Sequence, residues 1–98
     1  MVEINWTHEA EIWLRDIHTY IAVDNPNAVQ RTIAGIIARA KLLRTNPRLG
    51  YRYHAETSRE IRILLYGHYR IAYLIQSETN IDILGVFHGS LSIERYLV

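Results

Sequence analysis

Residues 60–88 read EIRILLYGHYRIAYLIQSETNIDILGVFH, and their pattern predicts three consecutive antiparallel strands. Side chains alternate in character over residues 61–66 and again over 69–76, which is the two-residue period of a strand. Residues 81–87 are rich in the β-branched and aromatic side chains that favour strands. We therefore expect this stretch to form most of the sheet.

The turn between the first two strands is expected at Gly67-His68. A two-residue hairpin loop of type II′ needs a positive φ at its first position, which glycine adopts without steric cost. This loop sets the register, so that Arg62 lies opposite Tyr73 and Arg70 opposite Leu65. The two arginines then point to opposite faces of the sheet. Either they serve a binding site, with Arg62 held by a cation–π contact to Tyr73, or they only pack their aliphatic stems on the sheet.

Working outward, the first half of the chain predicts a strand and two helices. Residues 2–6 alternate and predict a short edge strand, and Thr7 is a suitable N-cap for an amphipathic helix that ends near Val23. Pro26, at a first helical position, begins a second helix that ends before Asn46-Pro47. So short a connection predicts a helical hairpin packed on one face of a small antiparallel sheet, an α+β fold of order β-α-α-β-β-β.

The composition predicts one domain over residues 1–98 and excludes disulfides and thiolate metal sites, because the chain has 98 residues and no cysteine. We see neither a leader peptide nor an apolar run of about 18 residues, so a cytoplasmic protein is expected. Phosphate-binding loops and zinc-ligand spacings are absent from the sequence, so we expect no cofactor and no metal.

Charge is distributed unevenly along the chain. Residues 31–70 carry nine basic residues against two acidic ones, whereas the remainder carries two basic residues against eight acidic ones. Residues 47–59, PRLGYRYHAETSR, are expected to be irregular and interleave tyrosine with arginine. The asymmetry predicts two surfaces for different partners, although ordinary surface charge is an equally simple explanation.

Three motifs occur together and in order along the chain. They are DNPNAVQRTIAGIIARAKLLRTNPRLG (24–50), IRILLYGHYRIAYLI (61–75) and ILGVFHG (83–89). In this combination the chain resembles the RelE/ParE superfamily of bacterial type II toxins. The resemblance implies the same β-α-α-β-β-β fold, and a neutralising antitoxin bound as a partner.

The superfamily has two main activities, and resemblance to the members with each activity implies a different function for this chain. RelE-like members are ribosome-dependent mRNA endoribonucleases, and likeness to them implies a site built from Arg70, His88 and Tyr96. The lysine pair of those enzymes is replaced here by Ile61 and Ile63. ParE-like members poison DNA gyrase by binding it, and this chain resembles them in its His-Gly and the following Ile-Glu-Arg-x-Leu, although Leu91-Ser92 replaces their usual Arg-Asp.

We therefore expect a ParE-like toxin that acts by binding, with no catalytic residue. The expected target-binding residues are Arg62, Arg70, Tyr73 and His88. A lone histidine without a nearby carboxylate is a weak sign of catalysis, so a structural role for His88 at the end of its strand stays open. The alternatives are a RelE-like ribonuclease and a degenerate module that binds an antitoxin and has no toxicity.

The expected antitoxin surface follows from the two faces of the central hairpin. Both faces carry apolar residues, and two helices cover only one of them, so the other should remain as an apolar patch of the kind found at interfaces. The expected antitoxin-binding residues are Leu64, Tyr66, Tyr69 and Ile71. An acidic, amphipathic segment of the antitoxin is the expected occupant.

Overall fold

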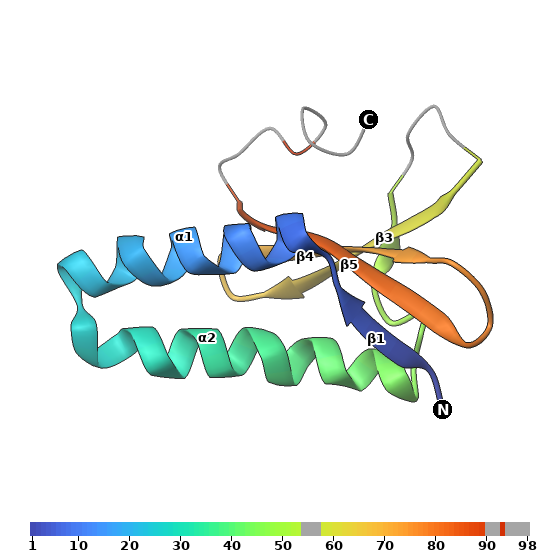
Figure 1. The fold of residues 1–98 in the computed structure, drawn as a ribbon, viewed down its shortest axis with the longest axis horizontal. Helices are drawn as coiled ribbons and strands as arrows, with labels where there is room; N and C mark the ends of the chain where they lie inside the picture. The colour runs from blue at the N-terminus through green and yellow to red at the C-terminus, as the bar shows by residue number, and fades with distance from the viewer. Residues whose placement is uncertain (54–57, 90–92, 94–98) are drawn as a thin grey trace.

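The computed structural model of the chain describes residues 1–53, 58–89 and 93. The elements, in order, are β1 (Glu3–Trp6), α1 (His8–Asp24), α2 (Pro26–Lys41), a short 3-10 helix η1 (Leu42–Arg44), β2 (Tyr51–Arg52), β3 (Glu60–Tyr66), β4 (Tyr69–Ile75) and β5 (Asn80–His88). In this part of the chain α1 and α2 form an antiparallel hairpin beside one sheet (Figure 1). The predicted α+β class and its helical hairpin are confirmed.

The sheet has the strand order β1-β5-β4-β3-β2 and differs from the prediction at both edges. At one edge β1 pairs with β5 in parallel, so the predicted antiparallel sheet contains one parallel pair there. At the other edge Tyr51 and Arg52 pair with Ile63 and Arg62 of β3, inside a segment that was expected to be irregular. A two-residue strand shows no period in the sequence, and parallel pairing joins residues too distant for a local pattern to reveal.

The central hairpin has the predicted register. Tyr66 lies opposite Tyr69, and Arg62 lies opposite Tyr73. Gly67 has a φ of 57° and is the one residue of the described chain with positive φ, which fits a type II′ loop.

The pairing of β4 with β5 shifts between Ala72 and Tyr73, so that Leu84 is an extra residue in β5. This bulge reverses the alternation of β5, which is why Val86 faces the same side of the sheet as Ile81 and Ile83.

The start of α1 is tied to the sheet by Thr7. Its Oγ1 accepts a hydrogen bond from the Ala10 N–H at 3.1 Å and donates one to the Ile83 carbonyl of β5 at 2.8 Å. Thr7 is thus the predicted N-cap and also fixes the position of the helix on β5. Pro26 occupies the first turn of α2, also as predicted.

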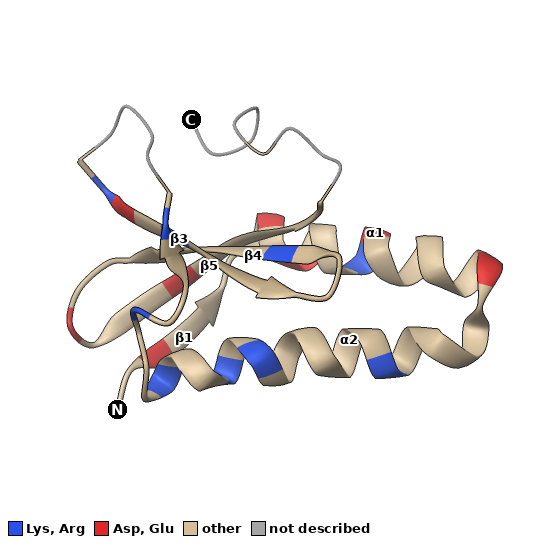
Figure 2. Cartoon of the chain, turned by 180° about the vertical axis from the view of Figure 1, so that it is seen from behind, with Lys and Arg blue, Asp and Glu red and all other residues tan. Residues whose placement is uncertain are grey.

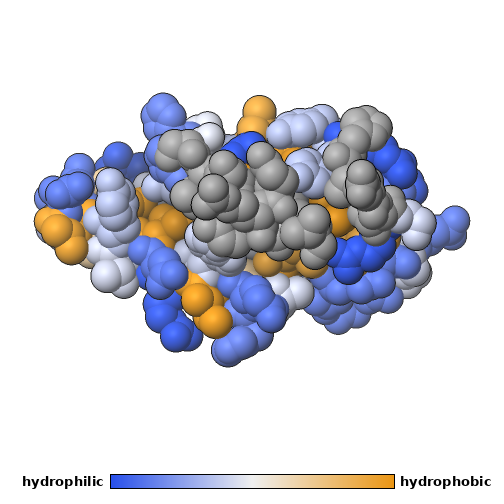
Figure 3. Space-filling view, turned by 90° about the horizontal axis from the view of Figure 1, so that it is seen from above, coloured by the Kyte–Doolittle hydropathy of each residue, from blue (hydrophilic) through white to orange (hydrophobic). Residues whose placement is uncertain are grey.

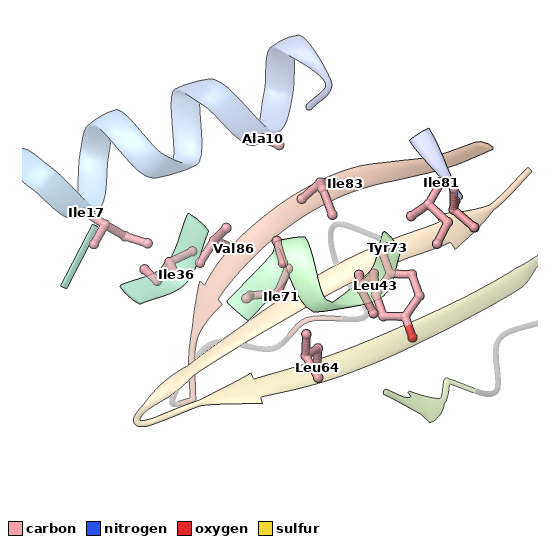
Figure 4. Packing of buried hydrophobic residues seen from close by; sticks show 12 residues of the cluster. Ala10, Ile17, Ile36, Leu43, Leu64, Ile71, Tyr73, Ile81, Ile83 and Val86 are labelled. Carbon is pink, nitrogen blue, oxygen red and sulfur yellow. The ribbon is translucent and has the colours of Figure 1, made fainter. Parts of the chain in front are cut away.

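The main core, which we call the helix-side core, lies between the helices and one face of the sheet (Figure 4). It includes Ile17 of α1 and Ile36 of α2, and on the sheet Leu64, Ile71 and Tyr73. The opposite face of the sheet carries a second cluster, which we call the far-face cluster. Its buried members are Ile61, Ile63, Ala72, Leu74, Phe87 and Ile93.

The far-face cluster corrects the prediction of an open apolar patch. Ile61 and Ile63 are 0% and 1% exposed, and Ile93 from beyond β5 is buried among them. Seen from above, hydrophobic side chains are visible between hydrophilic ones and beside the atoms drawn in grey (Figure 3). The prediction failed because it counted the two helices as the only cover and did not place Ile93 on this face.

The charge asymmetry seen in the sequence appears in the structure as a difference in charge between the two helices (Figure 2). Basic side chains are the only charged ones on α2, whereas α1 carries four acidic residues and one arginine. Among the residues that the structure describes, no helix is long and apolar enough to cross a bilayer.

Candidate functional site

Arg62 lies at the base of the hairpin, and its guanidinium is hydrogen-bonded on several sides. Nε donates to Glu60 Oε2 at 2.9 Å, and an Nη donates to the Gly50 carbonyl at 2.7 Å and to the Arg48 carbonyl at 3.4 Å. Glu60 also accepts two hydrogen bonds from Arg48, at 3.0 and 3.2 Å. These two arginines, Arg62 first, lower the pKa of the Glu60 carboxyl. Arg62 therefore anchors the segment around residues 48–50 to β3.

Tyr73 anchors the same segment from inside the core. Its ring is 0% exposed, its hydroxyl donates to the Pro47 carbonyl at 2.8 Å, and it accepts from the Gly50 N–H at 3.0 Å. Burial raises the pKa of the Tyr73 phenol, so the hydroxyl stays protonated and able to donate. The prediction that Tyr73 contacts a target is not compatible with this burial; its role is to hold the chain between α2 and β2.

Arg70 and His88 lie at the other end of the hairpin, beside its turn. Both line an open depression of about 450 Å³, which we call the tip depression. The His68 ring from the turn is stacked on the His88 ring, with centroids 6.3 Å apart and planes at 25°, and the Gly89 N–H donates to the His68 carbonyl at 2.7 Å. The structure thus brings together two of the four predicted target-binding residues and separates them from Arg62 and Tyr73.

A second hollow of about 390 Å³ lies between α1 and the end of β5, and we call it the α1 pocket. It is lined by Trp13, Asp16, Ile17, Tyr20, Tyr69, Val86 and His88. Most of its lining is apolar or aromatic, and Asp16 supplies the one carboxylate among the lining residues. Burial raises the pKa of Tyr69, so this wall of the pocket is a neutral phenol ring.

The four residues predicted to bind the antitoxin lie on the helix-covered face. Leu64 and Ile71 are 3% and 0% exposed within the helix-side core, so the prediction that they form an open patch is wrong. Tyr66 and Tyr69 are partly buried against the same core. The alternation assigned these residues correctly to one face, but not which face the helices cover.

Sequence reasoning missed the contribution of α1 to this region. Asp16 lines the α1 pocket with Trp13 and Tyr20, and none of the three was among the predicted site residues. The available signal was the spacing of these three residues, which places them along one side of a helix. Tyr96, part of the alternative ribonuclease site, lies outside the described residues. Within the described part of the chain no three His, Cys, Asp or Glu residues group closely enough to hold a metal ion.

A family model and a solved structure match this chain. A family model described as the ParE toxin of the type II toxin–antitoxin system parDE matches residues 4–92. A solved structure titled "Chromosomal ParDE TA system from P. aeruginosa" superposes with a TM-score of 0.76 at 20% sequence identity, covering 90% of this chain and 96% of that chain. No curated protein sequence matches the chain significantly.

At this level of identity the solved structure shows a shared fold only. The family model spans most of the chain and also confirms the predicted likeness to ParE. The chain therefore belongs to the ParE toxin family of type II toxin–antitoxin systems.

Proposed function

We propose that this chain inhibits growth by binding DNA gyrase and that a cognate antitoxin neutralises it. The observation that carries binding over RNA cleavage is the burial of Ile61 and Ile63 in the far-face cluster. A resemblance to RelE-like ribonucleases would imply a lysine pair in this region, where cations stabilise the scissile phosphate. Here Ile61 and Ile63 occupy this region and are buried with Ile93, so these two positions present no cation to RNA.

The proposed target contacts are Arg70 and His88 at the tip depression. Both side chains reach the surface there, together with His68 and the half-exposed Leu65. Arg62 was a further candidate, but its hydrogen bonds to the 48–50 segment favour a structural role. The two arginines therefore allow folding and target binding to be tested separately.

The proposed antitoxin partner is supported by the family and by charge. A solved relative of the same fold is titled as a ParDE system, and the outer surface of α2 with η1 presents Arg31, Arg39, Lys41 and Arg44 as exposed cations. An acidic segment of the antitoxin would be attracted to this surface. Co-purification with the product of the adjacent gene tests the pairing, and failure to form a complex at low and at moderate salt would contradict it.

A ribonuclease remains the second candidate because Arg70 and His88 line the same depression. Expression without the antitoxin distinguishes the two activities. Gyrase binding predicts SOS induction, filamentation, and inhibition of gyrase supercoiling by the purified protein. Translation arrest with cleaved mRNA would refute the gyrase proposal in favour of the ribonuclease, and normal growth with a folded protein would indicate the degenerate module.

The residues are tested with three matched substitutions. Arg70→Gln should relieve growth inhibition with the fold retained, whereas Arg15→Gln, an exposed arginine of α1, should leave inhibition unchanged. Arg62→Gln should lower the stability of the protein to urea. Full toxicity of a folded Arg70→Gln protein would remove Arg70 from the target site.

A further inference from the structure

The α1 pocket has one wall built from a single side of a helix. Trp13, Asp16, Ile17 and Tyr20 are spaced by three and four residues along α1, so they lie on neighbouring turns. Ile17 belongs to the helix-side core, whereas Tyr20 is 70% exposed. A carboxylate thus stands between an indole and a phenol ring on the rim of a hollow whose other lining residues are Ile17, Tyr69, Val86 and His88.

The opposite wall comes from the ends of β4 and β5. Tyr69 and His88 are cross-strand partners, and their rings are nearly perpendicular, at 86° with centroids 5.7 Å apart. Two perpendicular rings form a corner rather than a flat surface. Val86 completes this wall with an apolar side chain.

This arrangement matches the chemistry of a cationic side chain with a long apolar stem. Aromatic rings attract a cation through the negative potential of their faces, and a carboxylate adds a formal negative charge. The apolar lining suits methylene groups, which lysine and arginine bury while their charged heads stay near a polar group. A volume of about 390 Å³ is also within the range of pockets that bind small ligands.

We propose that the α1 pocket is an aromatic cage that receives the side chain of a lysine or arginine from a protein partner. A protein is the favoured source because the site is open at Tyr20, where a bound chain can pass over α1. This inference goes beyond the proposed function and does not depend on gyrase being the target. The rest of α1 is acidic, which adds attraction for a basic segment.

The test uses the full chain and three capped amino acids as probes. The N-acetyl methylamides of lysine and arginine carry the proposed cation, and that of norleucine has nearly the shape of lysine without the charge. Each is titrated while the indole N–H signal of Trp13 and the backbone amides of α1 are followed by NMR. We expect weak, saturable shifts with either cation and binding of norleucine about fivefold weaker, as expected for one exposed cation–π contact.

Two variants and one control locate the effect. Asp16→Asn and Tyr20→Leu should each weaken binding of the lysine probe by about two- to fivefold and change norleucine binding less. Asp24→Asn removes the same charge at the exposed end of α1, away from the pocket, and should leave binding unchanged. Because Asp16, Tyr20 and Asp24 are all exposed, these proteins should fold, which circular dichroism checks.

Three results would overturn the cage. One is norleucine binding as tightly as lysine, which would make the pocket merely apolar. Another is an equal loss in Asp16→Asn and Asp24→Asn, which would reduce the effect to general charge attraction. The third is an absence of shifts at Trp13 with either cation.

Discussion

Removing one oxygen atom from Tyr73 tests how the structure holds the chain between α2 and β2. In Tyr73→Phe the ring remains in the helix-side core, and only the hydroxyl is lost. That hydroxyl donates to the Pro47 carbonyl at 2.8 Å and accepts from the Gly50 N–H at 3.0 Å. The substitution therefore leaves the Gly50 N–H, which is buried, and the Pro47 carbonyl, which is partly buried, without this partner.

The expected cost follows from these two bonds. A hydrogen bond contributes about 1 kcal/mol net, and an unpaired buried group costs about 1–3 kcal/mol, so Tyr73→Phe should lower the free energy of unfolding by about 2 kcal/mol. For a chain of 98 residues this corresponds to a fall in Tm of roughly 8–16 °C. Such a loss is a large fraction of the stability of a small protein.

Urea unfolding of the two proteins, followed by circular dichroism, measures the difference. The midpoint should fall while the slope stays the same, because the surface exposed on unfolding is unchanged. Hydrogen exchange at the Gly50 amide should accelerate by at least the factor by which the substitution raises the unfolding equilibrium constant. Tyr51→Phe is the matched control, since Tyr51 is 50% exposed, and it should change stability by less than about 0.5 kcal/mol. A loss below about 0.5 kcal/mol in Tyr73→Phe would refute the anchoring role.

Three further predictions test other contacts of the fold. In Gly50→Ala the new Cβ would lie 2.5 Å from the Ile63 carbonyl oxygen, so urea unfolding should show a loss of about 1–3 kcal/mol, and an unchanged midpoint would contradict this packing. Gly67→Ala places a side chain at a φ of +57° with open space around it, so thermal unfolding should show a loss of stability of about 1–2 kcal/mol. Gly67→Asn should lose less stability, and equal losses in the two variants would argue that the backbone conformation is not the cause. The pKa of Glu60 is lowered in the folded state, so its ion pairs with Arg62 and Arg48 stabilise the protein above the unfolded pKa of about 4.5 and are lost as the pH falls through the lower folded value. The stability difference between wild type and Glu60→Gln, about 0.5–1 kcal/mol at pH 7, should therefore vanish at low pH, and a constant difference from pH 7 to pH 2 would contradict it.

The central hairpin was predictable because its determinants are local. Gly67 sets the turn, and alternation on either side sets the register down to the Arg62–Tyr73 pair. The helix starts at Thr7 and Pro26 follow from backbone chemistry that acts within a few residues. By contrast, nothing near Tyr51 indicated its pairing with Ile63, since that bridge depends on how the 47–50 segment is held by side chains far along the chain.

The candidate sites were predictable only in part, for a related reason. Arg70 and His88 were identified as functional candidates by the motifs around them, and the structure brings them to one depression. Tyr73 was predicted to contact a target because the strand pattern does not distinguish a tyrosine that is buried and hydrogen-bonded to the backbone from one that is exposed to a partner. Asp16 and Tyr20 were overlooked because their pocket exists only where α1 lies against Tyr69 and His88.

The sequence by itself determined the helices, the hairpin, its register and which residues share each face of that hairpin. These features arise from periodicity and from dihedral preferences that act over a few residues. Only the tertiary structure decided which face the helices cover, that the opposite face is also buried, where β1 joins the sheet, and that α1 and β5 border a pocket. Each of these depends on contacts between distant residues, such as Thr7 with Ile83 and Tyr73 with Pro47, whose formation requires the whole core to assemble.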